Sequence, residues 1–398
     1  MTPEEARAQF PALAGGRVEL DNAATTQKPL AVLDALRRHD LEATANVHRA
    51  THQRARAATT AYEGARGQAA RFLGAEPREV VFTRNATEGI NLVARGWAEP
   101  RLQRGDRVAV TALEHHSNLV PWQQVCARTG AELVVLPCDP HGRLPLPATL
   151  PPRTKLVAST RVSNALGTIV DTATLVRLAH AHGAAALLDL AQAAAHLPAD
   201  EGTRLADFVV LSAHKMYGPT GLGVLRGRAE RLEEMEPASF GGEMVSDVQA
   251  DAATWQPPPL RFEPGTPPIA QAAGFAAALG FLQDVGLAAA REHELALLRQ
   301  LLDGLQRVEG ARVVGPEGAD ERSGAVSLVL DGGDVQAAAA VLDLAGIAVR
   351  AGWHCAQPLL QRHLGCGPTL RASVALYNSA EDVERFLDAL PEAVAASR

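Results

Sequence analysis

Two neighbouring stretches decide the fold: residues 184–192 read AAALLDLAQ, and residues 207–215 read DFVVLSAHK. Each is an apolar run of strand length that ends in polar residues. A strand that is apolar at nearly every position, rather than at alternate ones, is typical of a sheet covered on both faces, which is the parallel α/β arrangement. Ligands of such sheets bind beyond the carboxyl ends of the strands. The polar residues where these two strands end are therefore the first candidates for a functional site.

The same alternation of short apolar runs with helical segments extends on both sides, over residues 78–226. Seven runs predict strands, at 79–83, 107–113, 132–137, 155–160, 184–189, 207–212 and 223–225. Amphipathic stretches of helical length lie between most of them, such as 85–97, 118–128 and 171–182. This order predicts a mainly parallel sheet with helices on both faces.

The pattern breaks at residues 227–268, which are rich in proline and glycine and predict a structured loop rather than a helix. Two long helical patterns follow, at 269–284 and 287–308, and the second would connect two domains. Residues 311–398 mix strand and helix patterns. They predict a smaller α+β domain at the C-terminal end of the sequence.

The composition is that of an ordinary globular protein. Lys and Arg number 38 against 45 Asp and Glu, which gives a formal net charge of −7, and 47% of the residues are hydrophobic. This balance argues against a disordered chain and against a polybasic surface for nucleic acid. Four cysteines are too few for a disulfide framework and indicate a reducing compartment. Neither a signal-peptide core nor an apolar stretch of membrane-spanning length is recognisable, so we expect a cytoplasmic protein without a membrane partner.

Charged residues at the two strand ends indicate a particular cofactor chemistry. Asp189 ends an otherwise apolar strand, where a buried carboxylate is costly unless a cation meets it. Lys215 follows the next strand. Asn85 with Glu88 predicts a capped helix N-terminus, which would either bind an anion or be no more than a well-capped helix. A Schiff-base lysine, a carboxylate for a pyridine nitrogen and a phosphate cradle together suit pyridoxal phosphate. The alternative, a structural salt bridge between Asp189 and Lys215, leaves three polar residues unexplained: Gln192, Ser212 and His214.

Two further segments hold candidate side chains. His115 and His116 are adjacent and do not face the same side of a regular element, so we expect no joint metal site. One of them would lie over an aromatic ligand; in the alternative, one is exposed and the other is packed. Cys355 lies in a polar turn near Arg350, surroundings that favour a thiolate, although an incidental turn cysteine has the same pattern. Arg371 is a candidate for bidentate capture of a carboxylate, the alternative being a surface arginine.

In these motifs the chain resembles the class V, fold-type I pyridoxal-phosphate enzymes, and within them the group II cysteine desulfurases of the Suf type. The matching segments occur in order along nearly the whole chain: LDNAATTQKP at 20–29, NVHR at 46–49, FTRNATEGIN at 82–91, EHH at 114–116, SN at 163–164, SAHKMYGPTG at 212–221, FEPGTP at 262–267, the segment around Cys355, and RAS at 371–373. One position departs from the family, because Trp353 stands where a histidine is usual.

The resemblance implies a large domain at residues 20–285 and a smaller domain, made of residues 1–19 and 286–398, that carries the cysteine. It also implies a homodimer that binds pyridoxal 5'-phosphate and no metal. The cofactor residues that it implies are Lys215 for the Schiff base, Asp189 for the ring nitrogen, Gln192 for the ring oxygen, His115 stacked on the ring, Thr87, Ser212 and His214 for the phosphate, and Thr266 from the second subunit. The substrate residues that it implies are Asn164 and Arg371 at the carboxylate, Arg350, His48 and Ala24 nearby, and Cys355 as the nucleophile.

The activity that the resemblance implies is conversion of L-cysteine to L-alanine. Lys215 would remove the α-proton, and Cys355 would attack the substrate sulfur and keep it as a persulfide. The partner would be an acceptor protein of the SufE or SufU kind, for iron–sulfur cluster assembly or another sulfur-transfer route. The alternatives are a selenocysteine lyase, another class V lyase or aminotransferase in which Cys355 is dispensable, and a non-catalytic scaffold. The remaining cysteines match no motif and are expected to be structural: Cys126, Cys138 and Cys366.

Overall fold

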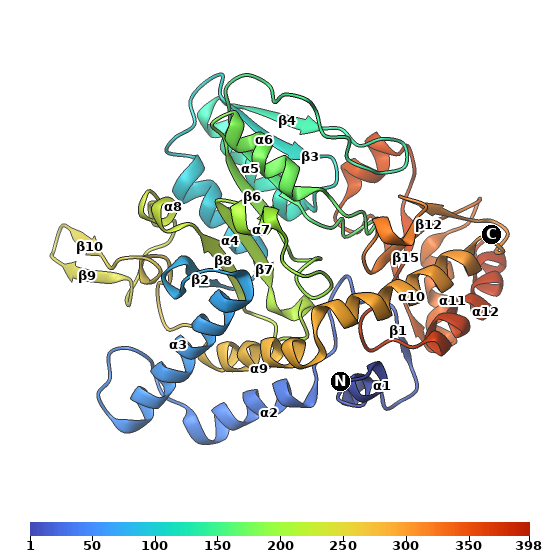
Figure 1. Cartoon of the computed structure of the whole chain (residues 1–398), viewed down its shortest axis with the longest axis horizontal. Helices are drawn as coiled ribbons and strands as arrows, with labels where there is room; N and C mark the ends of the chain where they lie inside the picture. Colours follow the sequence, from blue (N-terminus) through green and yellow to red (C-terminus); the bar gives the residue numbers. More distant parts are fainter.

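A seven-stranded sheet forms the centre of the larger part of the molecule (Figure 1). The computed structural model describes residues 1–398. In spatial order the strands are β2 (Val80–Thr83), β8 (Gly223–Gly227), β7 (Phe208–Ser212), β6 (Ala185–Asp189), β5 (Thr154–Thr160), β3 (Arg107–Thr111) and β4 (Glu132–Leu136). Only the two pairs that involve β8 are antiparallel. The prediction of a mainly parallel, seven-stranded sheet is therefore confirmed.

Successive residues of the central strands pack into different hydrophobic clusters. Leu188 and Val209 belong to one cluster, and their neighbours Leu187 and Val210 belong to another. The first cluster includes the helices α3 (Gln53–Leu73), α6 (Thr172–Ala181) and α9 (Ile269–Val285). The second includes α4 (Ala86–Val93) and α5 (Val120–Thr129). Both faces of the sheet are thus covered, which is why its strands are apolar at nearly every position.

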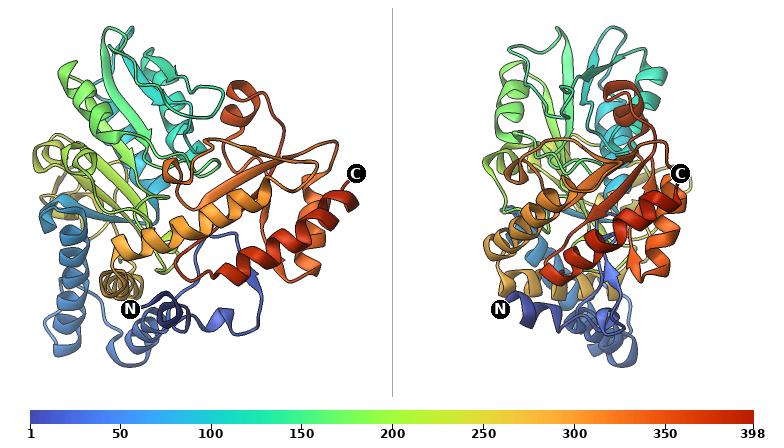
Figure 2. Two further views of the ribbon diagram at one scale, coloured as in Figure 1. Left: turned by 45° about the vertical axis from the view of Figure 1, so that its right-hand side comes forward. Right: turned by 90° about the vertical axis from the view of Figure 1, so that its right-hand side faces the viewer.

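A four-stranded antiparallel sheet forms the smaller domain. Its spatial order is β11 (Ala311–Val314), β12 (Ala325–Leu330), β15 (Thr369–Ser373) and β14 (Arg350–Gly352). A third cluster lies between this sheet and the helices α10 (Leu287–Leu305), α11 (Val335–Leu344) and α12 (Ala380–Ala396). Figure 2 shows α10 running from the larger part of the molecule into this domain.

The N-terminal segment joins the smaller domain. Strand β1 (Val18–Glu19) pairs in parallel with β13 (Ile347–Ala348), and Asp21 forms a further bridge with Ser373 of β15. Before it, α1 (Pro3–Arg7) is held by Arg7, whose guanidinium contacts Asp382 of α12. After it, the chain passes into the larger part through α2 (Leu30–Arg38), which packs on α9.

The segment after β8 differs from the predicted loop. It contains α8 (Ala229–Glu233) and a hairpin of β9 (Val245–Val248) and β10 (Ala253–Trp255), which projects from the body of the molecule (Figure 1). Most hairpin residues are exposed, so no apolar alternation marks them in the sequence. Strand β8 also runs two residues beyond the predicted 223–225, because Arg226 is buried and donates to the carbonyl oxygens of Ala206 and Thr203.

Helices α9 and α10 meet at a sharp bend. Gly286 lies between them with φ of 81°, a conformation that favours glycine. No single helix has the length and apolar composition needed to cross a bilayer, although α9 and α10 pass that test as a pair bent by 74°.

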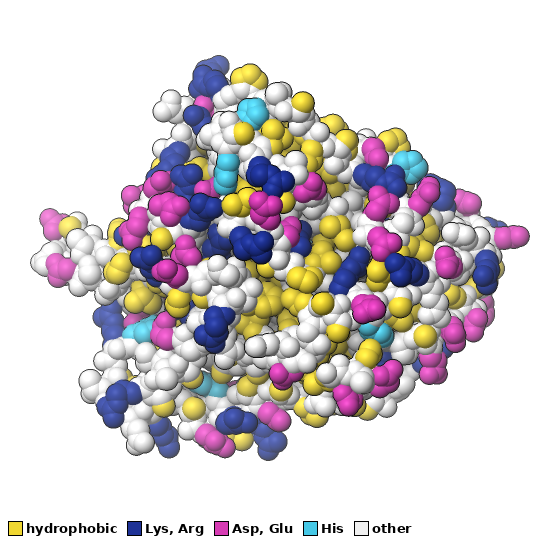
Figure 3. Space-filling view, viewed as in Figure 1, with side chains coloured by type: hydrophobic (Ala, Val, Ile, Leu, Met, Phe, Trp, Pro, Cys, Tyr) yellow, Lys and Arg dark blue, Asp and Glu magenta, His cyan; other side chains and the backbone are white.

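On the face shown in Figure 3, acidic and basic side chains are interspersed, in keeping with the modest net charge.

Candidate active site

A cavity of about 390 Å³ lies at the carboxyl ends of β5, β6 and β7 and is bounded on one side by the smaller domain. Most of the predicted site residues line it, namely Ala24, Thr87, His115, Asn164, Asp189, Gln192, Ser212, His214, Lys215, Arg350, Cys355 and Arg371. Two predicted residues, His48 and Thr266, do not line it. The fold thus brings together residues that are far apart in the sequence.

Asp189 is the last residue of β6 and is buried. Its Oδ1 accepts the backbone N–H of Ala191 at 2.8 Å, and no other protein donor reaches the side chain. Burial raises the pKa of this carboxyl, against the opposing effects of that hydrogen bond and of Lys215. A buried carboxylate with one open oxygen is suited to the N–H of a cationic ring.

Lys215 ends a short turn that follows β7 directly, and β7 is the neighbour of β6. Burial lowers the pKa of Lys215 to about 8, although the attraction of Asp189 opposes this shift. Much more of the amine is therefore neutral near physiological pH than for an ordinary lysine. A neutral amine is the form that reacts with a carbonyl group.

His115 is held by a serine that sequence reasoning missed. The Nδ1 atom of His115 accepts the backbone N–H of Ser117 at 3.1 Å and lies 2.9 Å from its hydroxyl oxygen. Ser117 Oγ is also 2.7 Å from Thr87 Oγ1. Burial lowers the pKa of His115 to about 3, so the ring is neutral and carries its proton on Nε2. The only sequence signal for Ser117 was its spacing, two residues after the histidine.

The N-terminus of α4 faces the same cavity. Asn85 Oδ1 accepts the backbone N–H of Glu88 at 2.9 Å, which confirms the predicted cap, whereas the Glu88 carboxylate reaches Arg84 instead of closing a capping box. The backbone N–H of Ala86 donates to Ser212 Oγ at 2.9 Å. A Cβ on Gly223 of β8 would lie 2.5 Å from Asn85 Cα, so only glycine lets the helix start approach the strand this closely.

Three buried polar atoms around the cavity have no partner in the protein. They are Asn164 Oδ1, His354 Nδ1 and Arg371 Nε. His354 Nε2 lies 2.8 Å from Thr369 Oγ1 and 3.1 Å from Thr369 O, so the proton is on Nε2 and Nδ1 is an open acceptor. Burial lowers the pKa of His354 to about 3 and keeps the ring neutral. Since buried polar groups are normally paired, these atoms mark a site built for a polar ligand.

Cys355 lies on a turn between β14 and the helical segment Leu359–His363. His354 and Cys355 have φ of 51° and 54°, the left-handed region that non-glycine residues rarely adopt. The backbone N–H of His116 donates to Cys355 O at 2.8 Å, and Asn164 Nδ2 donates to His354 O at 2.5 Å. The larger domain therefore holds this strained turn, while the Cys355 side chain stays exposed.

The position that departs from the family pattern lies outside the cavity. Trp353 is partly buried and packs against the main hydrophobic cluster.

The three cysteines other than Cys355 are buried or partly buried, whereas the Cys355 side chain is exposed. Burial raises the pKa of Cys126 to about 11 and also raises the pKa values of Cys138 and Cys366.

His48 and Thr266 lie in other surroundings. His48 Nε2 is 2.9 Å from Glu63 Oε1. Thr266 lines a separate cavity of about 770 Å³, which meets the first one at Asn85 and Thr87. The loop that carries Thr266 is anchored by the buried Glu263. Its carboxylate accepts hydrogen bonds from Arg66, Tyr62 and the backbone of Phe82.

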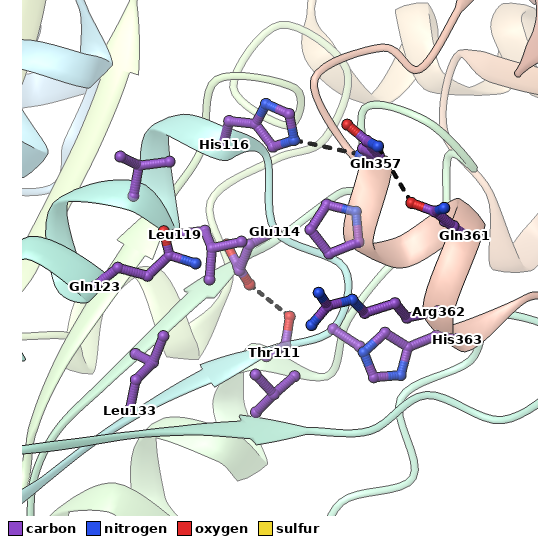
Figure 4. A pocket seen from close by; sticks show the side chains of 14 residues that line it. Thr111, Glu114, His116, Leu119, Gln123, Leu133, Gln357, Gln361, Arg362 and His363 are labelled. Atoms are coloured by element: carbon purple, nitrogen blue, oxygen red, sulfur yellow. Dashed lines mark hydrogen bonds between the residues drawn. The ribbon is translucent and has the colours of Figure 1, made fainter.

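A further cavity of about 520 Å³ lies beside the cysteine turn (Figure 4). His116 Nε2 accepts the backbone N–H of Gln357 there at 3.3 Å. Glu114, which also lines this cavity, is buried and accepts hydrogen bonds from Thr111 Oγ1, Asn118 Nδ2 and the backbone N–H of Thr160, at 2.5, 2.6 and 2.8 Å. Burial outweighs these three donors and raises the pKa of Glu114 to about 8. No group of three or more His, Cys, Asp or Glu side chains is arranged to bind a metal ion.

Residues 18–386 match the family model described as Aminotransferase class-V. A cysteine desulfurase of Synechococcus elongatus is 45% identical over 97% of this chain and 63% of its own length. A probable cysteine desulfurase of Pseudomonas putida is 45% identical, with 98% of both chains covered. The chain therefore belongs to the class-V aminotransferase family, in its group of cysteine desulfurases. It spans less than two thirds of the Synechococcus relative and nearly the whole of the Pseudomonas one.

Solved structures agree with this assignment. The apo structure of a cysteine desulfurase from Thermococcus onnurineus NA1 superposes with a TM-score of 0.94 at 38% identity, covering 99% of this chain and 98% of that one. The cysteine desulfurase CsdA of Escherichia coli, in an S-sulfonic acid form, superposes with a TM-score of 0.91 at 40% identity, covering 100% of both chains.

Proposed function

We propose that the protein is a pyridoxal-phosphate-dependent cysteine desulfurase, which converts L-cysteine to L-alanine and takes the sulfur on Cys355. The observation that carries this proposal is the content of one cavity. It combines a half-buried lysine with a pKa of about 8, a buried carboxyl with an open oxygen, unpartnered polar atoms, and an exposed cysteine at its edge. The first three are shared by enzymes of this cofactor, whereas the cysteine is specific to sulfur transfer.

The residues present fit pyridoxal phosphate. Its aldehyde would react with Lys215, and the protonated ring would accept electrons from the substrate carbon. Asp189 would accept the ring N–H through its open oxygen, and His115, neutral and fixed by Ser117, would lie over the ring. Thr87, Ser212 and the start of α4 form the polar end of the cavity, where the phosphate would bind.

Different residues of the chain would bind the substrate, move its α-proton and accept its sulfur. Arg371 Nε is an open donor for the carboxylate of an amino acid. The open atom of Asn164 is the acceptor Oδ1, which suits the amino end of the substrate rather than the carboxylate expected from the sequence. Lys215, with its lowered pKa, would take the α-proton and return it. The thiolate of Cys355 would attack the substrate sulfur, so that a sulfur–sulfur bond forms and the substrate's carbon–sulfur bond breaks. The electron pair of that bond stays with the carbon fragment, which takes a proton and leaves as alanine.

The test is alanine release from L-cysteine together with the mass of the protein. After turnover without a reductant, the wild type should carry one added sulfur atom on Cys355. The variant Cys355→Ala should lose most of the alanine release, and Cys138→Ala, which alters a half-buried thiol outside the cavity, should keep it. If Cys355→Ala retained most of the turnover, the protein would instead be a selenocysteine lyase or another class V lyase.

We also propose that the protein acts as a homodimer in the cytoplasm and passes sulfur to an acceptor protein for iron–sulfur cluster assembly. The cavity beside Thr266 adjoins the candidate active site at Thr87, which supports a second subunit placed against it. The exposed side chain of Cys355 supports transfer to another protein. Light scattering tests the dimer, and capture of acceptors by the protein with a persulfide on Cys355 tests the transfer.

A further inference from the structure

Two arginines face each other across neighbouring strands of the smaller domain. Arg350 on β14 is the direct register partner of Arg371 on β15. Like charges placed opposite each other in a sheet destabilise it unless a counter-charge is present. Arg371 is only 2% exposed, so water screens its charge poorly. The pair therefore needs an anion.

Asp21 supplies this anion to both arginines. Its Oδ1 is 3.0 Å from Arg350 Nε and 3.1 Å from Arg371 Nη2, and its Oδ2 is 2.9 Å from Arg350 Nη2. Its backbone is fixed by the bridge to Ser373 of β15, whose hydroxyl also accepts the backbone N–H of Ala23. One carboxylate on a rigid segment thus neutralises one of two positive charges.

The arrangement leaves one buried donor of the arginine pair open at the cavity. Arg371 Nη1 donates to the carbonyl oxygen of Asn164 at 2.9 Å and Nη2 pairs with Asp21, so only Nε has no partner. Arg350 and Arg371 both line the cavity, whereas Asp21 does not and lies behind them. Arg350, Arg371 and Asp21 together carry a net charge of +1, and an entering carboxylate would meet this charge.

We propose that Asp21 is a positioning residue that sets the charge of the arginine pair and so makes the site select substrates with one carboxylate over substrates with two. This inference rests on the proposed function, because L-cysteine has a single carboxylate. A second carboxylate on the substrate side chain would approach Arg350 near Cys355. Since Asp21 already neutralises Arg350 through its Nε and Nη2 atoms, that carboxylate meets no net positive charge there.

The test measures binding rather than turnover, so it can fail independently of the desulfurase activity. Dissociation constants of propionate and succinate are determined by ligand-observed NMR titration of the holoenzyme. Asp21→Asn keeps an oxygen acceptor for the arginines but removes the charge. The variant should lower the dissociation constant of succinate relative to that of propionate by about tenfold, because Arg350 is then no longer neutralised and can attract the second carboxylate. Asp343→Asn, which alters an exposed ion pair with Arg17 outside the cavity, should leave the ratio unchanged.

Charge compensation provides the second measurement. Arg350→Gln leaves Asp21 and Arg371 as a neutral pair, so both anions should bind about tenfold more weakly although Arg371 is intact. The double variant Asp21→Asn, Arg350→Gln restores one positive charge and should return propionate affinity to the wild-type range. An unchanged ratio in Asp21→Asn, or wild-type propionate binding in Arg350→Gln, would overturn the proposal. If Asp21→Asn does not fold, the Arg350→Gln result decides alone.

Discussion

Asn164 donates a hydrogen bond of 2.5 Å from its side-chain amide to the main-chain oxygen of His354, the residue before Cys355. The two residues belong to different domains and are separated by 190 positions. The other atom of the same amide, Oδ1, has no protein partner and lines the cavity. One side chain therefore both holds the cysteine turn and presents an open acceptor to the cavity.

Replacing Asn164 by alanine should consequently affect two kinetic parameters. KM for L-cysteine should rise because a substrate contact is lost, and kcat should fall because the turn with Cys355 is less firmly held. Loss of a hydrogen bond to a charged group costs about 1.5–3 kcal/mol, so we expect about a tenfold to hundredfold loss in kcat/KM. Steady-state alanine release measures both parameters. Unchanged kcat and KM in the folded variant would contradict the double role.

Glu114 should make the stability of the protein depend on pH. Burial raises the pKa of its carboxyl from the ordinary 4.5 to about 8 in the folded protein, so between these values the folded state holds a proton that the unfolded state has lost. The unfolding free energy should therefore fall as pH rises from 4.5 towards 8, with a slope approaching about 1.4 kcal/mol per pH unit.

The variant Glu114→Gln isolates this contribution. Its glutamine cannot ionise, so the difference in unfolding free energy between wild type and variant should be larger at pH 5 than at pH 8. Denaturant unfolding at both pH values measures it. Glu132→Gln, at a largely exposed ion pair with Arg107 on β4, serves as the control and should change little. A difference that does not vary with pH would show that Glu114 is ionised when buried.

Gly223→Ala should destabilise the protein and weaken its hold on the cofactor. The new Cβ would lie 2.5 Å from Asn85 Cα, and this contact involves backbone that cannot rotate away. We expect a cost of about 1–3 kcal/mol, typical of overpacking. Gly280→Ala on α9 is the matched control, since nothing lies within 4 Å of its Cβ, and it should stabilise the helix slightly. Thermal unfolding and the amount of retained cofactor measure both variants.

The central sheet could be predicted because its signal is local. Each strand is apolar on both faces, and the predicted strands fall on the observed ones to within a few residues. The hairpin of β9 and β10 could not be predicted, because its residues, whether apolar or polar, are mostly exposed and no buried face imposes a hydrophobic period on them. The length of β8 depends on Arg226, whose partners are carbonyl oxygens of another segment.

Single residues of the candidate site could be predicted from the sequence, but the contacts between them could not. Asp189 and Lys215 are marked by their positions at strand ends, which local patterns show. Asp21 lies within a recognised motif, but its contact with Arg350 joins residues 329 positions apart and exists only in the folded chain. Ser117 likewise contacts Thr87, which lies 30 positions away in another element. Pairings of this kind require tertiary structure.

The loop that carries Thr266 has a consequence for assembly. Glu263 fixes this loop to α3 and β2 through the buried guanidinium of Arg66 and the backbone of Phe82 within a single chain. In the proposed homodimer, a subunit that docks against this loop would meet a surface that is already ordered within the single chain. Little conformational entropy then remains to be lost on association, so dimerisation should proceed as the docking of two rigid bodies rather than by mutual folding.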